Sequence, residues 1–178
     1  MHPYLRFVTV IAGATRRPRV GPFDEARLTL RVEPQDVEVR RMNNGRYLTL
    51  MDLGRFDLAV RMGCGRAMIK NRWQPLVRSA CITFNRSLEL GQRFDLVTRI
   101  AGHDEKWWFI EQRFEREGTV HALAYLKGLF RAPSGNVSPR TIMEASGMVV
   151  GEAPPLPEAM RAWLASEEAM RAASRGAG

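Results

Sequence analysis

Residues 42–48 read Met42-Asn43-Asn44-Gly45-Arg46-Tyr47-Leu48, and this stretch decides the fold. Asn43 or Asn44 is suited to cap a helix, because a short amide side chain accepts hydrogen bonds from the first free backbone N–H groups. Apolar residues then recur at helical spacing as far as Met62. They are Tyr47, Leu50, Met51, Gly54, Leu58 and Met62, with Leu48, Phe56 and Val60 widening the surface. We expect such a helix to be buried over much of its circumference and to end at Gly63 and Gly65.

A strictly alternating segment precedes this helix. Residues 26–33 place Leu28, Leu30 and Val32 on one face and Arg27, Thr29, Arg31 and Glu33 on the other. This pattern predicts a half-buried strand. We expect the strand to end at Pro34 and the polar residues 35–41 to form a loop.

Period-two patterns follow the helix. They predict strands at residues 76–86, 93–100, 106–116 and 119–131, with turns at Gly91-Gln92, Gly102-His103 and Glu117-Gly118. Four consecutive strands with short connections predict an antiparallel meander. The order of strand, long buried helix and four strands predicts an α+β domain whose antiparallel sheet wraps around a central helix.

The two ends of the chain flank this domain. Residues 1–25 are expected to be an N-terminal extension and connector, 26–131 the domain, and 132–178 a C-terminal loop and helix. The apolar run 7–13 is shorter than the roughly 20 residues of a transmembrane helix, and its arginines follow it, unlike those of a signal peptide. We expect it to pack on the domain, with peripheral membrane contact as the alternative. Residues 132–156 are expected to be a loop, and a helix over 157–174, with Met160, Trp163, Leu164 and Met170 as its apolar side, is expected to pack outside.

Composition narrows the class of protein. The 178 residues are 45% hydrophobic and carry a formal net charge of +8. That charge suits nucleic acid, an anionic membrane or a phosphorylated small molecule. Cys64 and Cys81 are too few for a disulfide scaffold and favour a cytoplasmic protein. The three histidines have no spacing typical of a metal site or a catalytic triad, and the aromatics at 107–109 are too few to predict nucleic-acid stacking.

The layout and the Asn-Asn-x-x-Tyr run together resemble the hotdog-fold thioesterases of the 4-hydroxybenzoyl-CoA thioesterase-like branch, over approximately residues 26–131. In that family an acidic loop comes before this run, and a helix acid follows the Tyr by five residues. Asp36-Val37-Glu38 lies where the acidic loop is expected, and Asp52 lies five residues after Tyr47. Two features differ from the family pattern: an ungapped count puts Val37 at the loop acid, and Arg40-Arg41 replaces the usual Gly-His.

The resemblance implies the site residues. Asp52, Glu38 and Asp36 are the candidate catalytic carboxylates, as general base or nucleophile. The first turn of the helix would polarise the thioester carbonyl. The candidate substrate-binding residues are Asn43, Asn44, Gly45, Tyr47 and Arg41. Each also has a structural interpretation: Asp36 as a turn or cap, Glu38 as a solvated side chain, Asp52 as the partner of Arg55, and the two asparagines as helix caps.

The predicted function is hydrolysis of an acyl-CoA by a homodimer or homotetramer, with no metal or redox cofactor. Sites at the subunit interface are a feature of the family, so the helix acid would come from the partner chain. The alternative is a non-catalytic protein that binds acyl-CoA or an acyl chain, and a basic nucleic-acid or membrane module ranks third. Arginines and a lysine are candidates to bind the phosphates of CoA: Arg40, Arg41, Arg78, Arg86 and Lys127.

Overall fold

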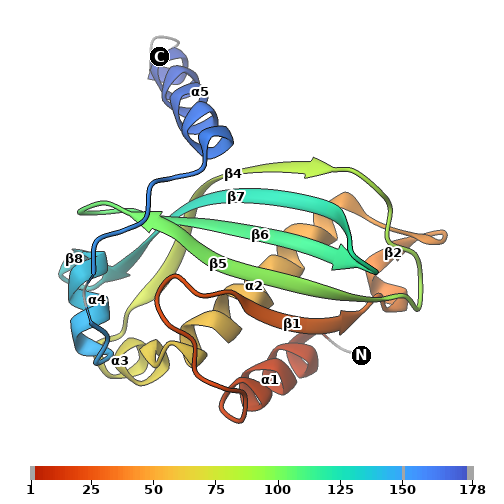
Figure 1. Ribbon diagram of the computed structural model, residues 1–178, viewed down its shortest axis with the longest axis horizontal. Helices are drawn as coiled ribbons and strands as arrows, with labels where there is room; N and C mark the ends of the chain where they lie inside the picture. The colour runs from red at the N-terminus through yellow and green to blue at the C-terminus, as the bar shows by residue number, and fades with distance from the viewer. Residues whose placement is uncertain (1–2, 150, 176–178) are drawn as a thin grey trace.

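The computed structural model describes residues 3–149 and 151–175 (Figure 1). The elements are, in chain order, α1 (Pro3–Ala14), β1 (Ala26–Arg31), a short 3-10 turn η1 (Pro34–Asp36), β2 (Val37–Glu38), β3 (Arg41–Met42), α2 (Asn44–Arg61), α3 (Cys64–Asn71), β4 (Gln74–Phe84), β5 (Arg93–His103), β6 (Trp108–Arg116), β7 (Thr119–Ala132), β8 (Gly135–Val137), α4 (Pro139–Ala145) and α5 (Glu158–Arg175). The predicted α+β architecture, a curved antiparallel sheet around one long helix, is confirmed.

The main sheet has the strand order β1-β5-β6-β7-β4, and every pairing is antiparallel. β5, β6 and β7 form the predicted meander. The prediction that β4 would pair with β5 is wrong, because β4 pairs with β7 at the far edge. The connection of residues 85–92 is long enough for this crossing: it can span roughly 26 Å, and three strand spacings are only about 14 Å. Leu88, fully buried within it, fixes the connection across the end of the sheet.

The central helix α2 begins where the sequence predicts. The Asn43 side chain accepts a hydrogen bond from the Gly45 backbone N–H at 2.7 Å, so Asn43 is the N-cap. The helix packs closely on the sheet at Gly54, where a Cβ atom would lie 2.5 Å from Thr98 Oγ1 and 2.9 Å from Gln112 Nε2. Only glycine allows this approach.

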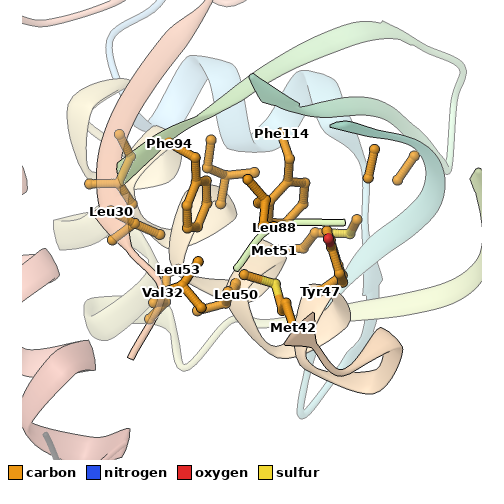
Figure 2. Packing of buried hydrophobic residues seen from close by; sticks show 14 of the residues in the cluster. Leu30, Val32, Met42, Tyr47, Leu50, Met51, Leu53, Leu88, Phe94 and Phe114 are labelled. Atoms are coloured by element: carbon orange, nitrogen blue, oxygen red, sulfur yellow. The ribbon is translucent and has the colours of Figure 1, made fainter. Parts of the chain in front are cut away.

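The main core lies between α2 and the concave side of the sheet (Figure 2). Tyr47 belongs to this core, with its ring centroid 4.7 Å from that of Phe114 and 5.1 Å from that of Phe84. The labelled side chains come from β1 and the residue after it, and from β3, α2, β5, β6 and the 85–92 connection. They are Leu30, Val32, Met42, Tyr47, Leu50, Met51, Leu53, Leu88, Phe94 and Phe114.

Two local predictions about chain breaks were wrong. Gly63, with φ of 87°, does separate α2 from the next element, but Gly65 lies inside a second helix, α3. Burial of Cys64 and Ala67 against the fold holds that helix in place despite its glycine. Gly102 and His103 belong to β5, not to a turn. The turn lies just after them, where the Asp104 carboxylate accepts hydrogen bonds from the backbone of Lys106 and Trp107.

The N-terminal extension packs on the domain, as predicted, and it does so as the helix α1. Phe7 and Val10 join the main core. Within the described residues, no helix combines the length and apolarity needed to cross a membrane.

Two buried carboxylates tie α1 and the chain after it to the domain. Asp36 Oδ2 lies 2.6 Å from Arg6 Nη1, and Asp36 Oδ1 lies 3.1 Å from Arg46 Nη2. Asp57 is bound in the same way, at 2.6 Å from Arg17 Nη1 and 3.3 Å from Arg61 Nη1. Both aspartates are fully buried, so each is compensated by two guanidinium groups.

The C-terminal region is more ordered than predicted. Residues 132–156, expected to be a loop, contain β8 and α4. Ser138 caps α4 through a hydrogen bond to the Thr141 backbone, and Pro139 begins the helix. The predicted final helix is present as α5 and packs on the outer side of the sheet through Met160, Trp163 and Leu164. Met170, expected on its apolar side, is 71% exposed, because α5 projects past the sheet at that point (Figure 1).

Candidate active site

An apolar cavity of about 420 Å³ runs along one flank of α2. α2 contributes Leu48, Thr49, Asp52, Arg55, Phe56, Leu58, Ala59 and Met62 to its wall. Their spacing corresponds to one side of a helix. β4 and β7 form the facing wall, and Cys64, Met68 and Ile142 from α3 and α4 close one end. The volume is within the range of small-molecule sites, about 300–1,000 Å³.

Asp52 and Arg55 are the charged residues of this wall. Arg55 donates a hydrogen bond to the Asp52 carboxylate and forms an ion pair with it. The Asp52 side chain is 56% exposed, whereas that of Arg55 is only 15% exposed. Burial lowers the pKa of Arg55, and the neighbouring Asp52 charge opposes this shift. The carboxylate is therefore accessible from solvent at the cavity wall, while the guanidinium is largely buried.

A buried amide holds Arg55 from the sheet side. Arg55 Nη1 donates to Gln112 Oε1 at 2.8 Å. Gln112 Nε2 in turn donates to Met51 O at 3.0 Å and to Thr98 Oγ1 at 2.8 Å. Sequence reasoning missed Gln112, although a polar residue at an inward-facing strand position between Ile110 and Phe114 was an available signal.

The predicted residues of the loop and helix N-terminus form a separate group. The Asn43 amide donates to the Glu38 carboxylate while its oxygen caps α2, so the loop acid and the helix start are joined. Asn44, Gly45, Glu38 and Arg41 are exposed. The free end of the helix dipole is therefore open to a ligand beside a carboxylate.

Two of the predicted site residues, Asp36 and Tyr47, are buried in the interior of the fold and are not open to a substrate. Asp36 is fully buried between Arg6 and Arg46, and its carboxylate also accepts from the Glu33 backbone at 3.0 Å. Tyr47 is 2% exposed and packs among aromatic rings. Burial raises the pKa of its phenol, although a hydrogen bond with the Leu88 backbone opposes the shift. These contacts give both residues a structural role.

The structure does not bring the two groups of candidate residues together within one chain. Eight residues of helix separate Asn44 from Asp52, a rise of about 12 Å. Among the predicted phosphate-binding residues, the Lys127 side chain is only 11% exposed, and its Nζ atom lies 3.0 Å from Glu167 Oε2. The other four, Arg40, Arg41, Arg78 and Arg86, are exposed. In the described part of the chain, no three His, Cys, Asp or Glu side chains gather as a metal ion would require.

Comparison with known proteins identifies the family. Residues 32–164, well over half of the chain, match the family described as the thioesterase-like superfamily. The chain belongs to this superfamily. Membership confirms the predicted family and places the chain among thioester hydrolases.

Relatives and solved structures agree with this assignment. Protein THEM6 of Danio rerio is 34% identical over 139 residues, which cover 75% of this chain and 67% of the relative. A Staphylococcus aureus protein solved in complex with CoA superimposes with a TM-score of 0.63 at 12% identity, covering 79% of this chain and 94% of that one. The gentisyl-coenzyme A thioesterase BH1999 gives a TM-score of 0.59 at 18% identity, covering 68% and 99%. At these identities the two structures show a shared fold, the hotdog fold.

Proposed function

We propose that this protein hydrolyses an acyl-CoA thioester to the free acid and CoA, with Asp52 as the catalytic carboxylate. The observation that carries the proposal is the position of Asp52, a largely exposed acid in the wall of a mainly apolar cavity whose other charged residue is Arg55. An acyl chain would fill the apolar part of such a cavity, and its thioester carbonyl would then lie near the carboxylate.

The chemistry follows from the two groups of residues. Asp52 would take a proton from water as the water oxygen attacks the thioester carbonyl carbon. The helix N-terminus at Asn44 and Gly45 would stabilise the resulting oxyanion. The C–S bond then breaks, and the proton passes to the departing thiolate of CoA. The contact between Arg55 and Gln112 would keep Asp52 in position through this sequence.

The separation of the two groups supports a dimeric site. β4 is the edge strand of the sheet, and most of its residues are exposed on both faces, including Leu76, Val77 and Phe84. An apolar, unprotected edge is suited to pair with another strand. Pairing of β4 with its copy would bring the helix N-terminus of one chain toward the Asp52 cavity of the other. Homodimer, homotetramer and cytoplasmic location remain predictions.

The alternative is a protein that binds acyl-CoA without hydrolysing it. It is favoured by the loop carboxylates, because Glu38 is hydrogen-bonded to Asn43 and Asp36 is enclosed by arginines. Of the three candidate carboxylates, this leaves Asp52 alone for catalysis.

A substrate screen separates the two functions. Purified protein is assayed for CoA release from aliphatic acyl-CoAs of increasing length and from aromatic acyl-CoAs, and its melting temperature is measured with the same compounds. Hydrolysis of at least one thioester supports the enzyme. A raised melting temperature without turnover supports the binding protein. If no acyl-CoA changes either quantity, both proposals are wrong.

A further inference from the structure

A second cavity lies at the opposite edge of the sheet from β4. This groove, of about 310 Å³, is formed between α1 and the edge strand β1. Its charged lining consists of four arginines and one acid: Arg6, Arg17, Arg31, Arg93 and Glu33. The proposed catalysis uses none of these residues.

Arg31 and Arg93 are directly opposed across the β1–β5 pair. Like charges at directly opposed positions in a sheet destabilise it. Within the described residues neither arginine forms an ion pair. Arg31 Nε donates a hydrogen bond to the backbone carbonyl of Gly91 at 2.9 Å. Arg27, on the same exposed face of β1, differs because it pairs with Asp95 at 3.1 Å and Glu115 at 2.9 Å. The repulsion is therefore local to the groove.

The other two arginines add positive charge rather than cancel it. Arg6 reaches the groove from α1 and also donates to the backbone carbonyl of Arg31 at 2.7 Å. Arg6 pairs with Asp36, but Asp36 also pairs with Arg46. In the same way Arg17 pairs with Asp57, which also pairs with Arg61. Asp36 and Asp57 thus each face two guanidinium groups. Glu33 is the carboxylate that lines the groove itself.

We propose that the groove between α1 and β1 binds a phosphate group. Guanidinium groups present paired N–H donors that match phosphate oxygens, and they bind phosphate more specifically than simple anions. A phosphate between Arg31 and Arg93 would replace their repulsion with two attractive contacts. The phosphate can belong to a phosphorylated nucleotide or to a lipid such as phosphatidic acid, since both present a phosphate monoester.

Thermal unfolding in sodium phosphate tests the site without any need for thioesterase activity. For a dissociation constant on the order of 1 mM, phosphate at ten times that concentration raises the melting temperature by about 4 °C. Sodium chloride of equal ionic strength is the control, and we expect it to change the melting temperature by less than about 1 °C. An equal shift in chloride, or no shift in phosphate, overturns the proposal.

The double variant Arg31→Gln/Arg93→Gln makes the test specific. Without phosphate it should melt at the wild-type temperature or slightly above, because the opposed charges are gone, and it should lose the phosphate shift. Arg27→Gln is the matched control: it should melt at a lower temperature and keep the full shift. A double variant that still responds to phosphate as the wild type does contradicts the site.

Two further arms identify the source of the phosphate. CoA and 3′-dephospho-CoA are compared in the wild type and the double variant, and a response that needs both the 3′-phosphate and the two arginines assigns a nucleotide ligand. Co-sedimentation with phosphatidylcholine vesicles, with and without phosphatidic acid, assigns a lipid headgroup if binding requires both the phosphatidic acid and the two arginines. A response to inorganic phosphate alone assigns the free ion. If hydrolysis fails and these responses persist, only the proposed catalysis is wrong.

Discussion

At the scale of single residues, three carboxylates that looked alike in sequence have different surroundings. Asp36 is enclosed by Arg6 and Arg46, Glu38 is bound to the cap residue Asn43, and Asp52 borders a cavity. A buried, doubly paired acid contributes to stability, whereas an exposed acid beside an apolar cavity is available to a substrate. The surroundings therefore separate structural acids from the candidate catalytic one.

Asp36→Asn is expected to destabilise the protein strongly. Removing the carboxylate charge leaves Arg6 and Arg46 without their shared partner, which costs about 3–5 kcal/mol of unfolding free energy when the pair is buried. Urea denaturation measures this quantity. Asp52→Asn is the comparison: the Asp52 carboxylate is 56% exposed and Arg55 keeps its hydrogen bond to Gln112, so we expect a smaller loss of about 1 kcal/mol. Equal effects from the two variants would contradict the structural role of Asp36.

Glu111 on β6 makes stability depend on pH. Burial alone would raise the pKa of its carboxyl, but hydrogen bonds from Arg99 and Arg113 outweigh burial and lower it below its ordinary value of 4.5. A lowered folded-state pKa means that the stabilisation is present above about pH 4.5 and is lost as pH falls through the folded pKa.

Glu111→Gln tests this pH dependence. At pH 7 the free energy of unfolding of the variant should be about 2 kcal/mol lower than that of the wild type. This difference should shrink steadily as the pH falls below 4.5. Urea denaturation at a series of pH values measures it. A difference that stays constant down to pH 3 would rule out this linkage.

At the scale of elements, the position of α2 depends on Gly54. In Gly54→Ala the added Cβ atom would lie 2.5 Å from Thr98 Oγ1 and 2.8 Å from Leu96 Cδ2, so the helix must move off the sheet. Overpacking of this kind destabilises the protein by more than the higher helix propensity of alanine stabilises it. We expect the free energy of unfolding to fall by about 1–2 kcal/mol.

Gly65→Ala in α3 is the matched control for Gly54→Ala. Its Cβ atom would meet Val60 at 3.6 Å, which is ordinary contact. We expect no loss and a gain of up to about 1 kcal/mol, since alanine restricts the unfolded chain. Urea denaturation of both variants decides the matter: a Gly54→Ala protein as stable as wild type would show that the close approach is not required.

Elements defined by local pattern were predictable from sequence, and elements defined by distant contacts were not. The alternation at 26–33 and the capped helix after Asn43 are carried by neighbouring residues. The crossing of β4 to the β7 edge depends on where residues 85–92 run, and no local pattern encodes that. α3 was missed because Gly63 and Gly65 suggest a break. α4 was missed because the prolines of residues 132–156 suggested a loop, although Ser138-Pro139 is a helix-start signal.

The candidate site divides in the same way. Asp52 was singled out through the resemblance to the hotdog thioesterases, in which a helix acid follows the Tyr by five residues. The cap role of Asn43 followed from its residue type. Gln112 lies 57 residues from Arg55, which it holds, and Arg6 lies 30 residues from Asp36, to which it donates. Only the folded chain brings such pairs together.

At the scale of the whole molecule, the exposed edge of β4 predicts a dimer. Cys81 is exposed on this strand, so Cys81→Arg should leave the isolated chain stable while it places like charges at a β4–β4 contact. Analytical ultracentrifugation should show a dimer for the wild type and a shift toward monomer for the variant, with a parallel loss of hydrolysis.

Ser134→Arg, in the turn between β7 and β8, adds the same charge away from β4. It should leave both the dimer and the hydrolysis unchanged. A wild type that sediments as a monomer at all concentrations while it hydrolyses acyl-CoA would contradict the shared site.

The central claim is that the acid beside the apolar cavity performs the hydrolysis. The most direct measurement is kcat for the preferred acyl-CoA in wild type, Asp52→Asn and Glu38→Gln, with melting temperatures measured in parallel. We predict that Asp52→Asn lowers kcat about 100-fold or more while its melting temperature changes by no more than about 3 °C, and that Glu38→Gln lowers kcat less than tenfold. An Asp52→Asn protein that keeps kcat within about threefold of wild type would contradict the account.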